Sequence, residues 1–440
     1  MAHRGSKPIR FQILILVALL MLFPCSSLMG SIAVYVGKNL TKDGSVLLAG
    51  YGDEPSSHWL EIVPRRKHAP GSTVTVGVTA RAALPGRLIK IPQAAETFKF
   101  ITMNYSYWAG FPAPLTNGGM NEHHVAARDV TLPSRPELVQ MTPNPQQGPN
   151  YSDLSRIAME RAKTAREAVE IVGRLIDEYG FSTYGGNSHV FADPNEGWVL
   201  LDFAGGQGLW IAKRLGPDDI WLNWRNQTGI GYIQDIPLDL KNDSDYMASD
   251  NFISFAVQRG WYDPKRGEPF NVIKVYCRSN GRGGEAETVR KELHQLAPRV
   301  TVKDLMRIVR FSARDSSGYG QVAHLRRGVH SDLGILWCAP ASALTAPFIP
   351  YRLGISDVPP EFKRHRYLTA GEASREVIDP KDRGLESTRY AFRSCKRLLY
   401  LATARRRQFL PEVTQALEAF EDRLLEEQQT VQRTAAKLLE

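Results

Sequence analysis

A predicted β-hairpin near the N-terminus constrains the fold of this chain more than any other feature. Residues 32–36 form an apolar run that predicts a strand, and residues 46–49 predict a second one. Between them lies Lys42-Asp43-Gly44-Ser45, and an Asp-Gly pair between two apolar runs is a strong hairpin signal. The fold is therefore expected to begin with two antiparallel strands, with Ser31 at the start of the first strand, on an edge of a sheet.

The residues before this hairpin have the pattern of a secretory signal peptide. Arg4, Lys7 and Arg10 are basic, and residues 11–23 are apolar except for one glutamine. This run is short against the ~20 residues that span a bilayer, so a cleaved leader is predicted in place of a membrane anchor. Residues 1–30 are therefore predicted to be a signal peptide or propeptide, and the protein is predicted to be secreted or periplasmic.

Removal of the whole leader makes Ser31 the first residue. The small-residue rule favours cleavage after Ser27 over cleavage after Gly30, because Leu28 is bulky, so exposure of Ser31 is expected to need a second cut. A terminal serine carries a hydroxyl nucleophile and a free α-amine that can serve as its base. The alternative is that Ser31 is an ordinary small residue beside a cleavage junction and that Asp43-Gly44 is an ordinary hairpin turn.

The composition indicates a globular protein and gives no sign of a nucleic-acid partner. The 440 residues are 43% hydrophobic and 23% charged, with a formal net charge of +9. The basic clusters at 65–67, 326–327 and 405–407 are scattered along the chain and are not interleaved with aromatic residues. They are interpreted as solvated faces. The sequence leaves the existence of a homo-oligomer open.

No metal or cofactor site is predicted. Outside the leader the cysteines are Cys277, Cys338 and Cys395, which lack metal-ligand spacing and are compatible with one disulfide plus a thiol or with three buried thiols. His123 and His124 are adjacent on a predicted strand, so their side chains point to opposite faces. The chain also has no phosphate-binding glycine loop and no zinc motif.

The order of predicted elements indicates an α+β fold with mostly antiparallel sheets. Strands in the first part are followed by two helices, a strand meander and, at the end of the chain, two long helices. A Pro-rich surface loop is predicted at 134–151. The predicted helices are 152–160, 165–179, 302–310, 385–403 and 409–438, and the meander strands are 188–192, 198–203, 208–213 and 220–226.

Two further segments have a predicted role. The aromatic run at 103–112 either lines a substrate cleft or anchors a loop. The last helix is amphipathic and is expected to pack on the body of the protein, with one apolar side that holds Leu410, Val413, Leu417, Phe420 and Leu424.

Short segments spread along the chain match a known pattern in their order and spacing. They are Val36-Gly37-Lys38, Asp43-Gly44-Ser45, Ile91-Pro92-Gln93, Met120-Asn121-Glu122-His123, 160–168, 192–198, 334–337, 347–351 and 354–355. Together they resemble the dipeptidase A-like peptidases, a family of N-terminal nucleophile hydrolases, over residues 31–400. The resemblance implies an αββα sandwich of two mostly antiparallel sheets flanked by helices, with 401–440 as a C-terminal helical extension.

The resemblance also implies a set of catalytic residues. The family has a cysteine at its mature N-terminus, and Ser31 stands at that position here. Asp53 falls where related hydrolases carry an acid that holds the terminal amine, and Asn226 aligns with an asparagine that donates to the oxyanion. Asn121 is a weaker candidate. Relatives often carry an arginine three residues before the acid, and Gly50 stands there instead.

Three functions follow as alternatives. The first is a secreted peptide hydrolase of the dipeptidase kind, which needs no cofactor and takes a small peptide or amide substrate. The second is an amidase of the same superfamily that acts on N-acyl substrates. The third is a secreted binding protein that retains the fold without catalysis. Asp129 is a further weak candidate for a site residue.

Overall fold

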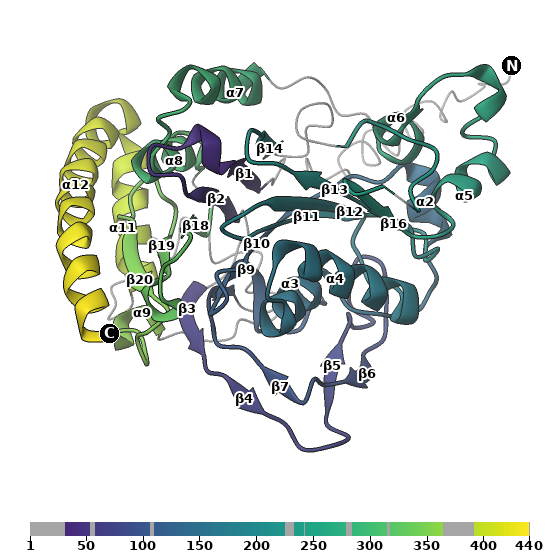
Figure 1. The fold of residues 1–440 in the computed structure, drawn as a ribbon, viewed down its shortest axis with the longest axis horizontal. Coiled ribbons are helices and arrows are strands. Elements are labelled where there is room, and N and C mark those ends of the chain that lie inside the picture. Colours follow the sequence, from purple (N-terminus) through teal and green to yellow (C-terminus); the bar gives the residue numbers. More distant parts are fainter. Residues whose placement is uncertain are drawn as a thin grey trace, which may run out of the picture.

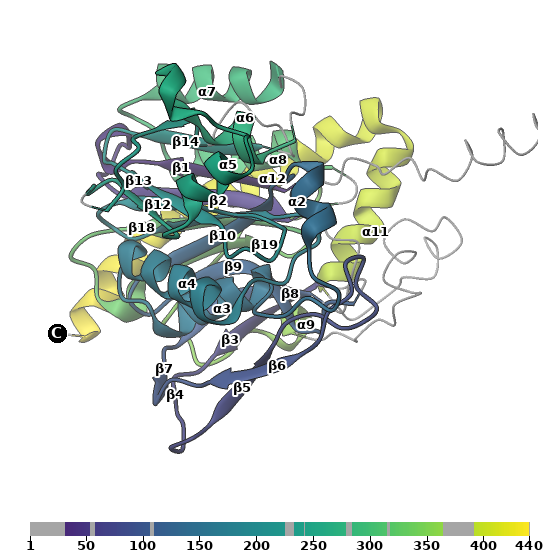
Figure 2. The same cartoon turned by 90° about the vertical axis from the view of Figure 1, so that its right-hand side faces the viewer.

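The computed structural model describes residues 31–52, 58–105, 110–224, 233–241, 243–278, 284–314, 317–363 and 391–439. The predicted leader and two predicted site residues, Asp53 and Asn226, lie outside these ranges. The described chain forms two antiparallel β-sheets stacked face to face, with helices on the outer face of each (Figures 1 and 2). This arrangement confirms the predicted α+β sandwich.

The first sheet contains the predicted N-terminal hairpin. Within the described ranges it has six strands in the order β14 (Ile220–Trp224), β1 (Ile32–Val36), β2 (Val46–Gly52), β18 (Tyr319–Leu325), β19 (Ile335–Ala339) and β20 (Ile349–Arg352). The strand β1 pairs with β14 on one side and β2 on the other. The expectation that Ser31 begins an edge strand is therefore wrong, because β1 is internal.

The second sheet is built mainly from consecutive strands and contains three of the four predicted meander strands. The prediction is wrong for the fourth, 220–226, because β14 crosses to the first sheet and pairs with β1. Its described strands are β16 (Tyr246–Ala248), β13 (Trp210–Leu215), β12 (Gly197–Asp202), β11 (Asn187–Ala192), β10 (Ala126–Thr131), β9 (Leu115–Asn121), β8 (Phe100–Tyr105) and β3 (His58–Val63). Short two-stranded pairs lie outside the two layers: β4 (Arg66–Lys67) with β7 (Glu96–Thr97), β5 (Thr73–Val76) with β6 (Ile89–Pro92), and β15 (Asp235–Ile236) with β17 (Phe270–Asn271).

Helices cover the outer faces of both sheets. The helices α3 (Tyr151–Arg161) and α4 (Ala165–Tyr179) pack on the second sheet, and α7 (Gly284–Leu296) and α8 (Val302–Ser312) pack on the first (Figure 1). The long helix α12 (Arg406–Leu439) lies beyond β19 and β20 and packs beside α11 (Ala391–Ala404). The remaining helices are α2 (Pro136–Met141), α5 (Phe252–Gln258), α6 (Val272–Tyr276) and α9 (Pro360–Lys363).

Strand alternation divides the core into layers. Ala33 and Tyr35 of β1 belong to the cluster between the two sheets, whereas Ile32 and Val34 belong to the cluster under α7 and α8. A third cluster joins the outer face of the second sheet to α3 and α4. Both faces of β1 are apolar, so the position of a residue along the strand, and not its type, shows which face it occupies.

The C-terminal helix α12 is attached by a buried ion pair. Arg310 of α8 donates from Nη1 and Nη2 to the two carboxylate oxygens of Glu421, at 3.1 and 2.5 Å, and from Nε to the Ala343 carbonyl at 2.9 Å. Glu421 also accepts from the Phe348 backbone N–H at 2.8 Å. The predicted packing of this helix on the body is confirmed, although Phe420 is exposed and only part of the predicted apolar side is used.

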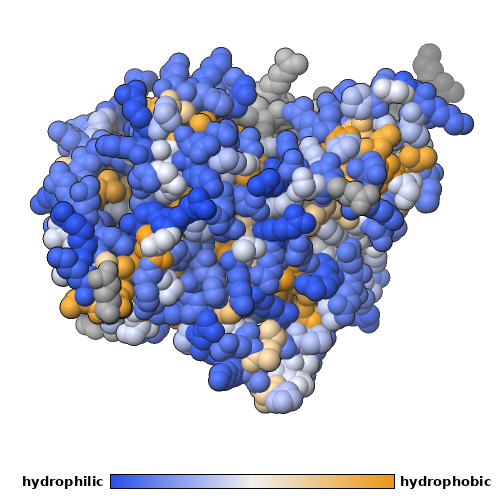
Figure 3. All heavy atoms as spheres, in the orientation of Figure 1, coloured by the Kyte–Doolittle hydropathy of each residue, from blue (hydrophilic) through white to orange (hydrophobic). Residues whose placement is uncertain are grey.

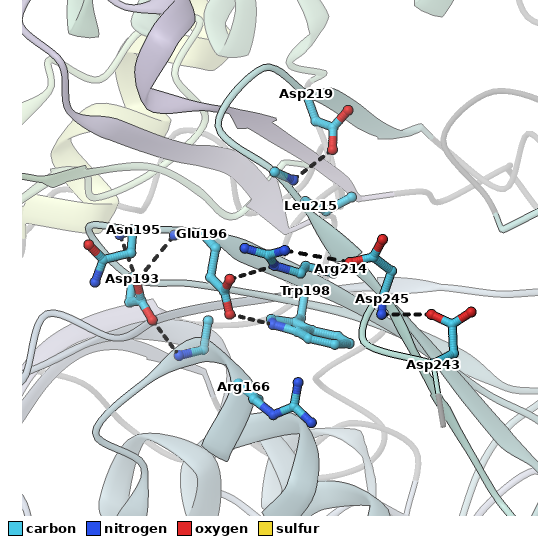
Figure 4. Close-up of polar contacts among 12 residues, drawn as sticks. Arg166, Asp193, Asn195, Glu196, Trp198, Arg214, Leu215, Asp219, Asp243 and Asp245 are labelled. Atoms are coloured by element: carbon cyan, nitrogen blue, oxygen red, sulfur yellow. Dashed lines mark hydrogen bonds and ion pairs between the residues drawn. The ribbon is translucent and has the colours of Figure 1, made fainter. Parts of the chain in front are cut away.

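The sequence segment that includes Asp193 and Trp198 is a structural turn (Figure 4). Asp193 accepts from the backbone N–H groups of Asn195 at 2.7 Å and of Ala165, the first residue of α4, at 2.8 Å. Glu196 accepts from Trp198 Nε1 at 2.9 Å. These bonds join the β11–β12 turn to the start of α4, so this part of the family pattern fixes the fold and does not supply reacting groups.

The Pro-rich stretch predicted as a loop holds α2, which begins at Pro136, a position where the missing N–H of proline is harmless.

The viewed face of the molecule is mostly hydrophilic (Figure 3). Among the described helices, none is both long and apolar enough to cross a bilayer.

Candidate active site

Ser31 lies at the start of β1 and faces the space between the two sheets. It has the same strand parity as Ala33 and Tyr35, which belong to the inter-sheet cluster, and only 7% of its surface is exposed. Because Ser31 directly precedes this internal strand, its hydroxyl lies beside the two strands that pair with β1, namely β14 and β2. Of the predicted catalytic residues that the structure describes, only Ser31 faces this inner space.

Two rows of inward-facing residues cross β1, β2 and β18 at this point. Each row has a glycine at its centre, so the middle strand contributes no side chain to the space between the sheets. The first row is Ala33, Gly50 and Gln321; the second, with the β1–β2 register continued by one residue, is Ser31, Gly52 and Tyr319.

The guanidinium of Arg128 fills the space left by these glycines. Arg128 is on β10 of the second sheet, is 2% exposed, and donates from Nη1 to Tyr319 Oη at 2.8 Å and to Gln321 Oε1 at 3.2 Å. A Cβ at Gly50 would lie 3.1 Å from Arg128 Nε and 2.1 Å from the Ile32 carbonyl oxygen. The structure therefore places an arginine from the opposite sheet where the sequence analysis found no arginine on β2.

A second inward-facing polar residue, Asn223 of β14, lies opposite Ala33. It is fully buried, its Nδ2 donates to Ser188 Oγ on the second sheet, and its Oδ1 accepts from Trp221 Nε1 at 2.6 Å. This contact joins the two sheets beside β1. Sequence reasoning missed Asn223 and Arg128; an isolated polar residue on an inward strand position is the only signal either one gives.

The structure does not bring Asn121 to Ser31. The preceding residue, Met120, faces the inter-sheet core, so Asn121 points to the outer face under α3. Its Nδ2 donates to the carbonyls of Met159 and Ala162 at 2.9 and 2.7 Å, and its Oδ1 accepts from His123 and Val125 backbone N–H groups at 3.0 Å each. Its amide is thus committed to the β9–α3 packing, and the oxyanion role gains no support.

We expect Asn121→Ala to lower the free energy of unfolding by about 2–3 kcal/mol, because it leaves buried carbonyl and N–H groups without partners. Urea unfolding measures this effect, with Asn195→Ala in the exposed β11–β12 turn as a control that should change little. Any peptide hydrolysis should persist in the folded fraction. A stable variant with no hydrolysis would instead restore a catalytic role for Asn121.

Asp53 and Asn226 lie outside the described residues. The described residues that precede them are Gly52 at the end of β2 and Trp224 at the end of β14. Trp224 and Tyr51 lie opposite Ile32 on the two sides of β1. In the sequence, Asp53 is therefore one residue after β2 and Asn226 is two residues after β14, and both strands flank the Ser31 end of β1.

A serine, a histidine and an aspartate form a chain of contacts under α3. Ser155 Oγ lies 3.3 Å from His189 Nδ1, and His189 Nε2 lies 3.0 Å from Asp202 Oδ2. All three residues are fully buried, and burial raises the pKa of Asp202. A nucleophile must reach its substrate, so this buried group is structural. Asp129 lies on the same face and accepts a hydrogen bond from Asn187 Nδ2 at 2.9 Å, so it is also assigned a structural role.

The three cysteines are free thiols, which settles the alternatives that the sequence left open. Burial raises the pKa of Cys395 to about 11 and also raises the pKa of Cys277 and Cys338. A thiol with a raised pKa stays protonated at neutral pH and is a poor nucleophile. None of these three thiols is therefore a candidate nucleophile.

His123 and His124 are directed to different neighbours. The ring of His123 packs edge-on against Phe98, with centroids 4.4 Å apart, and His124 Nε2 lies 3.1 Å from the Ser331 carbonyl oxygen. In the part of the chain that the structure describes, no group of three or more His, Cys, Asp or Glu side chains is arranged to hold a metal ion.

The aromatic run at 103–112 is described in part. Phe111 packs against Tyr151 and Tyr184, with ring centroids 5.5 and 5.8 Å apart, and the hydroxyls of Tyr105 and Tyr151 are hydrogen-bonded. Tyr105 and Phe111 are buried in this cluster, which agrees with the loop-anchor interpretation. Residues 106–109, which include Tyr107 and Trp108, lie outside the described ranges.

Residues 31–304 match the family described as Peptidase family C69. The chain belongs to peptidase family C69. A "Probable dipeptidase A" of Streptococcus pyogenes serotype M3 (strain SSI-1) is 25% identical over 52% of this chain and 45% of its own length. A "Dipeptidase" of Bifidobacterium longum (strain NCC 2705) is 26% identical over 52% of this chain and 42% of its own length. The resemblance to dipeptidase A-like peptidases is thus confirmed.

This member of peptidase family C69 spans less than half the length of these curated relatives. Among solved structures, a C2A mutant of conjugated bile acid hydrolase from Clostridium perfringens aligns over 77% of this chain and 100% of its own, with 10% identity and a TM-score of 0.35. The match to the C69 family begins at Ser31, the residue at the start of β1.

Proposed function

We propose that this C69 protein is an exported hydrolase of short peptides, with dipeptides as its substrate class and Ser31 as its nucleophile. The observation that carries the proposal is that Ser31 both opens the family match and begins an internal strand on the inner face of the sandwich. The dipeptidase names of the relatives support the substrate class.

In the proposed mechanism the α-amine of Ser31 is the general base. With a usual pKa of about 7.7–8.0, this amine is partly neutral near pH 7 and takes the hydroxyl proton, directly or through water. The oxygen attacks the amide carbonyl, the amine product leaves with that proton, and water hydrolyses the acyl-enzyme. Asp53 is proposed to hold the amine and Asn226 to donate to the oxyanion.

The direct test is the N-terminus of the exported protein together with a substrate panel. Mass spectrometry of the mature protein should show a chain that begins at Ser31 and hydrolyses dipeptides. A mature chain that begins at Leu28 and hydrolyses nothing would support the binding-protein alternative. Hydrolysis of N-acyl amides without hydrolysis of dipeptides would support the amidase alternative.

We expect kcat/KM for a dipeptide to rise with pH and to level off about one pH unit above the amine pKa, near pH 9. The α-amine acts as a base only when deprotonated, so activity should grow as the pH passes upward through the amine pKa of about 7.7–8.0. Initial rates between pH 5.5 and 9 measure the profile, and unfolding curves at the same pH values show whether the fold stays intact. A flat profile with an intact fold would contradict the amine as the base.

A further inference from the structure

Arg128 carries a buried charge that its protein neighbours only partly satisfy. Its Nη1 is hydrogen-bonded to Tyr319 and Gln321, but Nε and Nη2 are buried without a hydrogen-bond partner. Among the described residues, no carboxylate lies within ion-pair distance of this guanidinium. Burying a charged group is costly unless it is paired, so an arginine in this state indicates a missing anion.

The unpartnered atoms indicate the shape of that anion. Nε and Nη2 form one edge of the planar guanidinium, and this edge matches the two oxygens of a carboxylate. Tyr319 and Gln321 hold the opposite edge through Nη1 and fix the plane of the group. The ring of Tyr319 lies 5.2 Å from the guanidinium carbon and further restricts its orientation. Arg128 is therefore positioned as a receptor for a carboxylate.

The position of Arg128 relative to Ser31 indicates which carboxylate Arg128 would bind. Strands lie roughly 4.8 Å apart and two residues along a strand span roughly 6.8 Å, so the α-carbons of Ser31 and Gly50 lie roughly 8 Å apart. Arg128 Nε lies beside Gly50, and its Nη1 reaches toward the row that contains Ser31. One extended substrate residue spans about 3.3–3.6 Å. The rest of the interval is filled by the contact of the scissile amide with Ser31 at one end and the hydrogen bond of the carboxylate to Arg128 at the other.

We propose that Arg128 binds the C-terminal carboxylate of a peptide whose scissile amide lies at Ser31, so that the protein favours substrates with one residue after the cleaved bond. The inference rests on the proposed function. It also accounts for Gly50, which leaves room on the inner face for a guanidinium that comes from the second sheet. An arginine at position 50 is not needed when Arg128 occupies that space.

The test compares a dipeptide with the same dipeptide capped as a C-terminal carboxamide. The wild-type protein should hydrolyse the free acid with a kcat/KM about 10- to 100-fold higher than the carboxamide, the range expected for a charge-assisted pair. Arg128→Gln should remove this preference, chiefly by raising KM for the free acid. Arg128→Lys, which keeps the charge but loses the two-pronged edge, should retain part of the preference.

Stability provides a second readout, because a merely structural arginine behaves differently. Removing a buried charge that lacks an anion should leave the melting temperature of Arg128→Gln unchanged or raised. Arg135→Gln is the matched control. Arg135 donates a hydrogen bond to the Val275 carbonyl and lies elsewhere in the molecule, so this variant should keep the preference for the free acid. Equal acid-to-carboxamide ratios in wild type and Arg128→Gln would overturn the inference.

Calorimetric binding separates this inference from the proposed function. Ser31→Ala should bind the dipeptide more tightly than its carboxamide, and Ser31→Ala with Arg128→Gln should bind both alike. Carboxylate-dependent binding in a protein that hydrolyses no peptide would support the Arg128 site and reject the hydrolase. Hydrolysis without any carboxylate preference would support the hydrolase and reject the Arg128 site.

Discussion

Ser31→Ala is expected to reduce kcat for dipeptide hydrolysis by roughly three orders of magnitude or more, which is the scale seen when a hydrolase loses its nucleophile. The variant keeps the α-amine and removes only the hydroxyl oxygen. Folding should be little affected, because serine and alanine differ by one side-chain atom and the strand backbone that Ser31 precedes is unchanged. Initial rates on a dipeptide, together with circular dichroism of the variant, measure both effects.

Ser31→Cys is the matched variant for this experiment. A thiol is intrinsically the stronger nucleophile and depends less on its base, so the cysteine variant should retain hydrolysis and become sensitive to alkylation. The wild-type serine protein should resist alkylating agents at the active site, since its described thiols are protonated at neutral pH. Undiminished hydrolysis in Ser31→Ala would remove Ser31 from the mechanism.

Glu421→Gln is expected to lower the free energy of unfolding by about 3–5 kcal/mol, the largest stability loss we predict. Arg310 and Glu421 are buried, with side chains 5% and 3% exposed, and the substitution leaves the Arg310 charge without its partner in a dry site. It also weakens the acceptor for the Phe348 N–H. Urea unfolding measures the loss, and limited proteolysis should show earlier cleavage in α12.

Two controls distinguish the ion pair from the helix itself. Glu427→Gln removes an exposed carboxylate from the same helix and should change the free energy of unfolding by less than about 0.5 kcal/mol. Replacing the pair together, as Arg310→Met with Glu421→Leu, should recover much of the loss, because neither charge remains buried alone. A loss below about 1 kcal/mol in Glu421→Gln would mean that water reaches this ion pair.

The parts of the fold that local sequence determines could be predicted. The strand Ile32–Val36 and the helix Ala165–Tyr179 have the predicted bounds. Each has a clear period and a clear end: an apolar run before a turn in the first, and a Thr164 cap and Gly180 stop in the second. The helix α2 could not be predicted, because the Pro-, Gln- and Asn-rich composition of 134–151 favours a loop, whereas proline at the first position of a helix is tolerated.

The candidate site could be predicted only in part, because its groups come from distant segments. Ser31 follows from the hairpin and the leader, but Arg128 reaches the same space from the other sheet, and its Tyr319 partner is 191 residues away in sequence. Two of the four hydrogen bonds of Asn121, those to the Met159 and Ala162 carbonyls, likewise depend on where α3 packs. Residue patterns show parity along one strand, but not which strand of the second sheet lies opposite.

The attachment of α12 affects how the newly made chain can fold. Glu421 follows Arg310 by 111 residues, so a ribosome must add all of these residues before this guanidinium meets its acid. Domains tend to fold from the N-terminus during synthesis, yet here the part of this layer that α12 covers stays open until that helix is made. Chains that terminate early should therefore expose apolar surface, which makes them targets for chaperones and quality-control proteases.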